Sequence, residues 1–142
     1  MFSSNVVRLR QCHDAFNVGD FDTAVTLVAP DIELTDHGRG EVLNGRAAFR
    51  SWMEGFYAMS SDIKIVDAQY IDAGDTVVAQ FRAIGVQDGS MDSFPVSNKP
   101  YSLDVCEVWR FNELGQAEEG HNYSDSLGML IQLGHIPVPE TA

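Results

Sequence analysis

The stretch of residues 101–134 limits the fold more than any other, because it is typical of two strands, a turn and a short closing helix. Along residues 103–111 apolar and polar side chains alternate, which is the period of a half-buried strand. Glu107 interrupts the apolar face between Val105 and Trp109. Burying a carboxylate costs free energy unless it is paired, protonated or in a cavity. We therefore expect this face to line a pocket.

Three helices are expected ahead of the sheet. The first is capped by Ser3 or Ser4, and its inward stripe consists of Phe2, Val6, Leu9, His13 and Phe16. Asp20 caps a second, shorter helix, which Pro30 prevents from continuing. A third helix opens at residues 44–45 and carries a wide apolar face.

The other segments show strand periods. A short strand is predicted at residues 31–35, a loop at 36–40, and two longer strands at 63–71 and 76–86. Helices that precede an antiparallel meander predict an α+β fold, in which three N-terminal helices cover a cone-shaped, curved antiparallel sheet. The mouth of this cone is expected at the 36–40 loop.

The charge balance argues against polyanionic partners. With 9 basic and 21 acidic residues, the net charge is −12, which repels phosphate backbones and anionic lipids. We expect neither nucleic acid nor membrane as a partner; the alternative is that the charge only favours solubility. Cys12 and Cys106 are too few for a disulfide framework, and we see no signal-peptide pattern, so a cytoplasmic location is expected.

No spacing typical of a metal or nucleotide site occurs. The histidines and cysteines form no HxxxH, HExxH or CxxC pattern, and the chain lacks GxGxxG, P-loop and GxSxG motifs. We therefore expect no metal and no cofactor. The chemistry left open is acid–base catalysis by carboxylates, histidines and amides in an apolar pocket.

The candidate catalytic residues are Asp36, His37, Glu107 and Asn122. Asp36 and His37 end a strand and enter a loop, where the alternative is a turn closed by an Asx bond. Glu107 lies among apolar neighbours, so its pKa is expected above that of an ordinary glutamate. The alternative is an ion pair with Arg82 or Arg50, which would lower that pKa instead.

The sequence does not predict which face of the last strand points inward, because neither of its alternating faces is plainly apolar. Asn122 lies on one face and His121 on the other, and His121 is as consistent with the surface as with a ligand site. The predicted substrate contacts are Phe16, Trp52, Tyr57, Trp109, His121 and Asp125. For Phe16, Trp52 and Trp109 the alternative is a place in the core.

Three segments together resemble the SnoaL-like polyketide cyclase family, of the nuclear-transport-factor-two-like superfamily: residues 16–34, 44–56 and 119–134. The resemblance implies a single SnoaL-like α+β barrel domain over residues 1–142, without a cofactor and usually dimeric. Members of this family close a ring of an aromatic polyketide by intramolecular aldol condensation. The resemblance therefore implies a hydrophobic small-molecule substrate.

The resemblance also implies site positions, and this chain departs from the family at the most important one. The catalytic aspartate of the cyclases falls on Asn122, and a pocket histidine falls on Glu107. Positions that tune stereochemistry fall on Phe16 and Trp52. An amide cannot take a proton, so Asn122 can orient or donate but cannot act as the base.

A more distant resemblance is to ketosteroid isomerase. The general base of that enzyme falls on Asp36, its protonated aspartic acid on Glu107 and its tyrosine donor on Cys12. Enolisation fits both resemblances, with Asp36 as base and a neutral Glu107 as donor to the enolate.

We expect a polyketide-cyclase-like enzyme. The alternatives are an isomerase, hydroxylase, dehydratase or epoxide hydrolase, or a ligand-binding domain without catalysis. A homodimer is expected through the outer sheet face, where Val78, Ile84 and Val108 lie opposite to the pocket.

Overall fold

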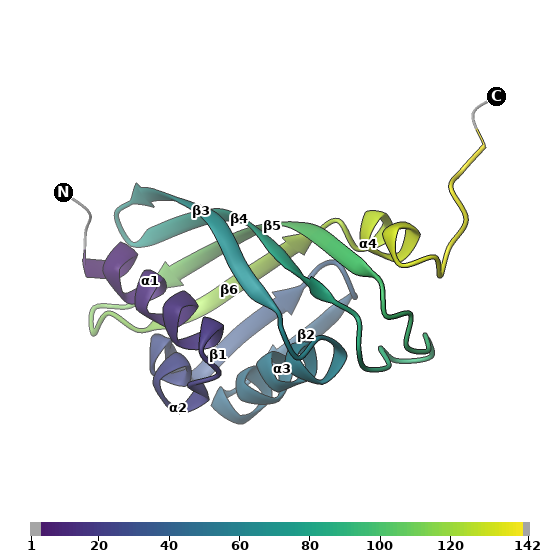
Figure 1. Ribbon diagram of the computed structural model, residues 1–142. Coiled ribbons are helices and arrows are strands. Elements are labelled where there is room, and N and C mark those ends of the chain that lie inside the picture. Colours follow the sequence, from purple (N-terminus) through teal and green to yellow (C-terminus); the bar gives the residue numbers. More distant parts are fainter. Residues whose placement is uncertain (1–3, 141–142) are drawn as a thin grey trace.

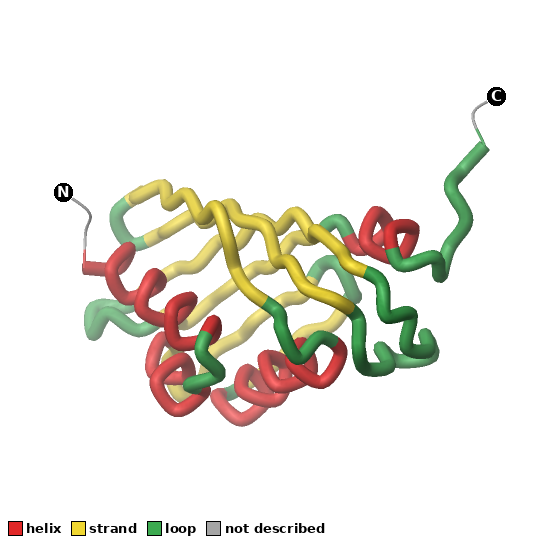
Figure 2. Tube along the Cα trace, viewed as in Figure 1, coloured by secondary structure: helices red, strands yellow, loops and turns green. Residues whose placement is uncertain are grey.

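The computed structural model describes residues 4–140 and contains helices on one side of a curved sheet (Figures 1 and 2). The helices are α1 (Ser4–Asn17), α2 (Phe21–Ala24), the 3-10 turn η1 (Val25–Leu27), α3 (Arg46–Met59) and α4 (Ser126–Gln132). The strands are β1 (Val28–Asp36), β2 (Glu41–Asn44), β3 (Lys64–Ala73), β4 (Thr76–Val86), β5 (Pro100–Phe111) and β6 (Ala117–Ser124).

The six strands form one sheet in the order β2-β1-β6-β5-β4-β3. The α+β class and the curved sheet covered by helices are confirmed (Figure 1). One detail differs from the sequence-based expectation, because β1 pairs with β6 in parallel and the sheet is therefore mixed. Strands β2 and β3 are its two edges and do not pair with each other, so the sheet stays open.

The first half of the chain follows its local signals. On α1 the residues Val6, Leu9, His13 and Phe16 are all buried, as their helical spacing predicts. Asp20 caps α2 by accepting a hydrogen bond from the Thr23 amide (3.1 Å). Gly45, with φ +88°, precedes α3, where a side chain would be strained. The predicted cap Ser3 and the predicted inward Phe2 lie outside the described residues.

The first two strands differ most from the prediction. β1 begins at Val28 rather than at residue 31 and contains Pro30, which lies where the pairing register with β6 shifts. β2 was not predicted, because its four residues are mostly exposed and show no apolar alternation. The chain leaves β1 and enters β2 through a turn at residues 37–40, one residue shorter than the predicted loop 36–40 because Asp36 belongs to β1.

Burial along β5 and the contact of Gly120 with Trp109 show which side chains of β5 and β6 point toward the helices. On β5 every second residue from Tyr101 to Phe111 is buried, including Glu107. On β6, Gly120 lies directly under the Trp109 ring, since a Cβ there would be 2.4 Å from it. Gly120 and Asn122 therefore face inward with Trp109, and the alternating residues His121 and Tyr123 face outward.

Within residues 4–140, no helix combines the length and apolar character that crossing a bilayer requires.

Candidate functional site

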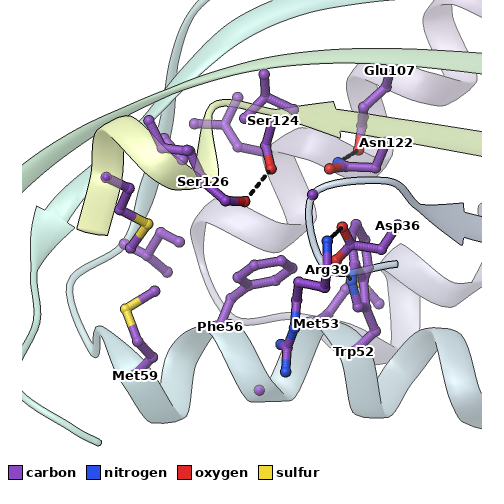
Figure 3. Close-up of a pocket in the computed structure, with 18 of the residues that line it drawn as sticks. Asp36, Arg39, Trp52, Met53, Phe56, Met59, Glu107, Asn122, Ser124 and Ser126 are labelled. Atoms are coloured by element: carbon purple, nitrogen blue, oxygen red, sulfur yellow. Dashed lines mark hydrogen bonds between the residues drawn. The ribbon is translucent and has the colours of Figure 1, made fainter. Parts of the chain in front are cut away.

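A cavity of about 410 Å³ lies between the inner face of the sheet and helices α1, α3 and α4. Its volume is within the range of small-molecule binding sites. Most of its wall is apolar, with aromatic and sulfur side chains that include Phe49, Met53, Phe56 and Met129. Figure 3 shows that polar groups from β1, β5, β6 and the start of α4 enter this apolar space.

Glu107 is held at the wall of this cavity by three donors. Its Oε1 accepts hydrogen bonds from His13 Nε2 (2.9 Å) and Trp109 Nε1 (3.2 Å). Its Oε2 accepts from Asn122 Nδ2 (2.9 Å). His13 Nδ1 lies 2.7 Å from the Tyr70 hydroxyl, which donates to it when the ring is neutral. The buried carboxylate is therefore paired and fully oriented.

These contacts overturn the expectation that the pKa of Glu107 is raised. Burial alone raises it, but the hydrogen bond and charge of His13, together with bonds from Asn122 and Trp109, outweigh burial and lower the pKa. The partner is also not one of the predicted arginines, since Arg82 pairs with Asp67 and Arg50 with Asp22. The lowered pKa and the three donors favour a Glu107 carboxylate that accepts hydrogen bonds, which argues against the expected role as a neutral donor.

Asp36, at the end of β1, is the second buried acid of the cavity and is only 2% exposed. Its Oδ2 accepts from the indole nitrogen of Trp52 (2.9 Å), and its Oδ1 accepts from the backbone nitrogen of Arg39 (3.2 Å). The second bond is the Asx contact that the sequence offered as the alternative. The structure therefore combines that turn with a carboxyl group at the cavity wall.

The turn after Asp36 forms part of the cavity mouth. The Arg39 guanidinium makes two hydrogen bonds of 2.8 Å to the carboxylate of Asp92, in the loop between β4 and β5. It also lies 3.8 Å from Glu41. Arg39, Asp92 and Glu41 all line the cavity, so this ion pair joins its two loop margins.

The structure brings Asp36, Glu107 and Asn122 together around the cavity but leaves His37 outside it. His121 points to the outer face because it alternates with Asn122 along β6, and His37, in the turn after β1, lies beside it. There His37 Nε2 lies 2.9 Å from His121 Nδ1, and the His37 ring stacks on Tyr123 with centroids 4.2 Å apart. His121 also reaches Glu119 at 3.0 Å.

The predicted substrate contacts divide in the same way. Phe16, Trp52 and Trp109 line the cavity. Tyr57 does not, because its hydroxyl donates to the carbonyl of Phe16 between the helices. Asp125 does not either, because it caps α4 by accepting from the Gly128 amide (3.0 Å).

Several cavity residues were missed by sequence reasoning. His13 was recognised only as part of an inward stripe, although a titratable residue on an apolar helix face is itself a signal. Ser124 and Ser126 also line the cavity, and only the orientation of β6 could have revealed them. Cys12 lies in the wall, where burial, with a smaller effect of Glu107, raises the pKa of its thiol and keeps it protonated.

No group of three or more histidine, cysteine, aspartate or glutamate side chains among residues 4–140 is placed to hold a metal ion.

Comparison with known proteins identifies the family. The SnoaL-like domain matches residues 9–119, most of the chain, and the protein therefore belongs to the SnoaL-like family. A search of curated proteins gives no match.

Solved structures share the fold over nearly the whole chain. A proposed SnoaL-like polyketide cyclase from Jannaschia sp. CCS1 is 19% identical with a TM-score of 0.85, covering 96% of this chain and 99% of the other. IdmH, a proposed polyketide cyclase from Streptomyces antibioticus, is 23% identical with a TM-score of 0.80, covering 93% and 99%. AclR, a proposed hydroxylase from Streptomyces galilaeus, is 19% identical with a TM-score of 0.82, covering 96% and 85%.

Proposed function

We propose that this protein is an enzyme that closes a ring in a hydrophobic, carbonyl-bearing small molecule by intramolecular aldol condensation, with Asp36 as the base. One observation carries the proposal: the buried Asp36 carboxyl lies in the wall of an apolar cavity, with both oxygens oriented by N–H donors. Membership of the SnoaL-like family supports the reaction class.

The proposed reaction needs no external oxidant or reductant. The Asp36 carboxylate removes a proton from the carbon next to a carbonyl, and the electron pair of that C–H bond moves toward the carbonyl oxygen as an enolate. The enolate carbon then attacks a second carbonyl of the same molecule and forms the ring bond. The new alkoxide takes back the proton that Asp36 holds, which restores the carboxylate.

Glu107 and Asn122 have a different role in this proposal. Each of the Glu107 oxygens already accepts hydrogen bonds, and the Asn122 amide donates one of them. Asn122 has no group that can take a proton, and Glu107 accepts three hydrogen bonds against two at Asp36, so fewer of its lone pairs are left for a substrate proton. We infer that this pair fixes the cavity wall and the His13 ring, while the proton transfer occurs at Asp36.

The second candidate is a small-ligand-binding domain without catalysis. The observation that favours it is Asn122, an amide where the resemblance places the acid/base aspartate of the cyclases. Such a domain would bind hydrophobic carbonyl compounds in the same cavity and release them unchanged.

The test is turnover of a polyketide-type methyl ester by the wild-type protein and by Asp36→Asn. We expect the substitution to lower kcat by about 10²–10⁴-fold, the range that general acid–base catalysis contributes. The matched control is Asp104→Asn, which makes the same change on the exposed outer side of β5 and should leave kcat unchanged.

Thermal unfolding must show that both variants are folded. If folded Asp36→Asn keeps the wild-type turnover, Asp36 only organises its turn and the proposal fails. If the wild-type protein binds the ester without converting it, the ligand-binding candidate replaces the enzyme.

A further inference from the structure

The junction between β6 and α4 directs two hydroxyl groups into the cavity beside Asp36. Ser124 is the last residue of β6 and Ser126 the first of α4, and both line the cavity. Asp125 between them is fixed, since its amide donates to the Asp104 carbonyl (3.0 Å) and its side chain caps α4. Figure 3 shows the two hydroxyls pointing toward each other, with their oxygens 3.1 Å apart.

Gly38 shows how close these hydroxyls lie to the proposed base. A Cβ on Gly38 would be 2.3 Å from Ser124 Oγ, 2.5 Å from Ser126 Oγ and 3.5 Å from Asp36 Oδ1. The two hydroxyls and the carboxylate therefore converge around one glycine. Because glycine has no side chain, the turn after β1 can approach both hydroxyls this closely.

Most hydrogen-bond donors near Asp36 and Glu107 already have an acceptor within the protein. The indole of Trp52 donates to Asp36, and the side chains of His13, Trp109 and Asn122 donate to Glu107. The two serine hydroxyls carry two hydrogens, and their mutual bond uses one of them. Within residues 4–140 neither hydroxyl has another hydrogen-bond partner. One donor hydrogen beside Asp36 is thus unused.

An enolate needs such a donor, and Glu107 cannot supply it as a carboxylate. We propose that the Ser124–Ser126 pair binds the carbonyl oxygen of the substrate and donates a hydrogen bond to the enolate oxygen while Asp36 takes the α-proton. This inference rests on the proposed function and narrows the substrate class to ketones with a C–H bond next to the carbonyl. The serines keep their protons throughout, so the only proton moved is the one that Asp36 takes and returns.

The probe for this inference is 2-acetonaphthone, a flat apolar methyl ketone whose carbonyl oxygen can accept hydrogen bonds but not donate them. Enolisation exchanges its methyl hydrogens with D₂O, and NMR measures the exchange rate. Quenching of tryptophan fluorescence measures its Kd, because Trp52 and Trp109 both line the cavity.

We expect the double variant Ser124→Ala/Ser126→Ala to slow exchange by about 10²–10³-fold, as the loss of an oxyanion donor does in other enzymes. The Kd should rise by about tenfold. Ser102→Ala is the matched control, because Ser102 lies on the outer side of β5 beside Arg82 and should change neither quantity. Ser126→Thr should exchange faster than Ser126→Val, since these two replacements have nearly the same shape and differ in the hydroxyl.

The outcomes separate this inference from the choice of Asp36 as base. If Asp36→Asn abolishes exchange while the double serine variant exchanges like wild type, the base stands and the serine pair is wrong. If the serine variant loses exchange and Asp36→Asn keeps it, the pair stands and the base is wrong. If wild type shows no exchange, the binding measurement decides: a tenfold rise of Kd supports the pair, and an unchanged Kd or no binding overturns it.

Discussion

The two faces of the sheet hold acidic residues in different ways. On the inner face Glu107 is buried, and three side chains donate hydrogen bonds to it. On the outer face, three residues further along β5, Arg110 is half-exposed and pairs with Glu118 and Glu119 from β6. The same strands thus carry a carboxylate that depends on fixed partners and others that water can solvate.

The difference determines what each charge contributes. Exposed ion pairs contribute only about 0–1 kcal/mol to stability, because water solvates either partner after the other is lost. Water cannot solvate a buried charge after one of its partners is removed, so the loss of any one partner destabilises the folded protein strongly. The inner face therefore holds its polar groups in fixed positions, whereas charges on the outer face can change at little cost in stability.

The strongest test of this comparison is Glu107→Ala. It leaves the donors of His13, Trp109 and Asn122 without an acceptor inside the core, and we expect a loss of about 3–5 kcal/mol in the free energy of unfolding. Glu118→Ala on the outer face is the control and should cost less than about 1 kcal/mol. Urea denaturation measures both, and equal effects would show that Glu107 is not held as described.

The pH dependence of stability tests the state of Glu107. Its folded pKa is lowered, so its contribution is complete above the ordinary value of 4.5 and disappears as the pH falls through the still lower folded value. Glu107→Gln removes this contribution and should cost about 1.5–3 kcal/mol at pH 7, the value of hydrogen bonds to a charged group. The difference between wild type and Glu107→Gln should shrink steadily between pH 5 and 3. A constant difference would show that the carboxyl is not charged in the native state.

Periodicity was sufficient to predict most of the fold. The inward stripe of α1, the cap at Asp20, the third helix after residues 44–45 and the alternation of β5 all depend on nearest neighbours along the chain. The parallel pairing of β1 with β6 joins segments about 85 residues apart, and no local pattern encodes it. The same holds for the short edge strand β2.

The site was harder to predict, because each polar group depends on a partner from another element. Glu107 was recognised as unusual, but its effect on the cavity depends on His13, 94 residues earlier, and that contact reverses the expected pKa shift. The orientation of β6 depends on Gly120 lying under Trp109. The sequence does not reveal that contact, so it does not distinguish His121 from Asn122 as the cavity residue. It also gives no sign that the hydroxyls of Ser124 and Ser126 point into the cavity.

The outer face leads to a prediction about assembly with a second copy of this chain. Val78 pairs directly with Val108, so two half-buried valines lie side by side at the middle of the sheet, with His121 next to Val108. We expect a homodimer through this part of the face, because the apolar surface of the two valines gains from being covered.

Val108→Asp should weaken the dimer at least tenfold, or about 1.4 kcal/mol, through the burial of an unpaired charge. Leu114→Asp, the same kind of change in the exposed β5–β6 turn, should leave it intact. Sedimentation at micromolar concentration measures the dimer affinity of both variants, and a monomeric wild-type protein would contradict the prediction.

The smallest expected effect concerns the hydroxyl of Tyr101, a buried polar group on the inner face that, unlike Glu107, is not held by hydrogen bonds. Tyr101 is 4% exposed and lines the cavity, and within residues 4–140 its hydroxyl has no hydrogen-bond partner. Burial is the main reason that the pKa of Tyr101 rises to about 12; the Ser60 hydroxyl, which lies near the Tyr101 hydroxyl without the geometry of a hydrogen bond, opposes the shift. The Ser60 hydroxyl itself bonds to Asp62 Oδ1 at 3.1 Å.

Tyr101→Phe should therefore leave the protein as stable as wild type or stabilise it by up to about 1 kcal/mol, because a buried hydroxyl without a partner costs free energy that its removal recovers. Tyr123→Phe on the outer face is the control: that side chain is 45% exposed, its hydroxyl is solvated, and its stacking on His37 needs only the ring. Thermal unfolding should show a Tm that is unchanged or a few degrees higher for Tyr101→Phe and unchanged for Tyr123→Phe. A clear loss of stability in Tyr101→Phe alone would mean that its hydroxyl is bonded in solution.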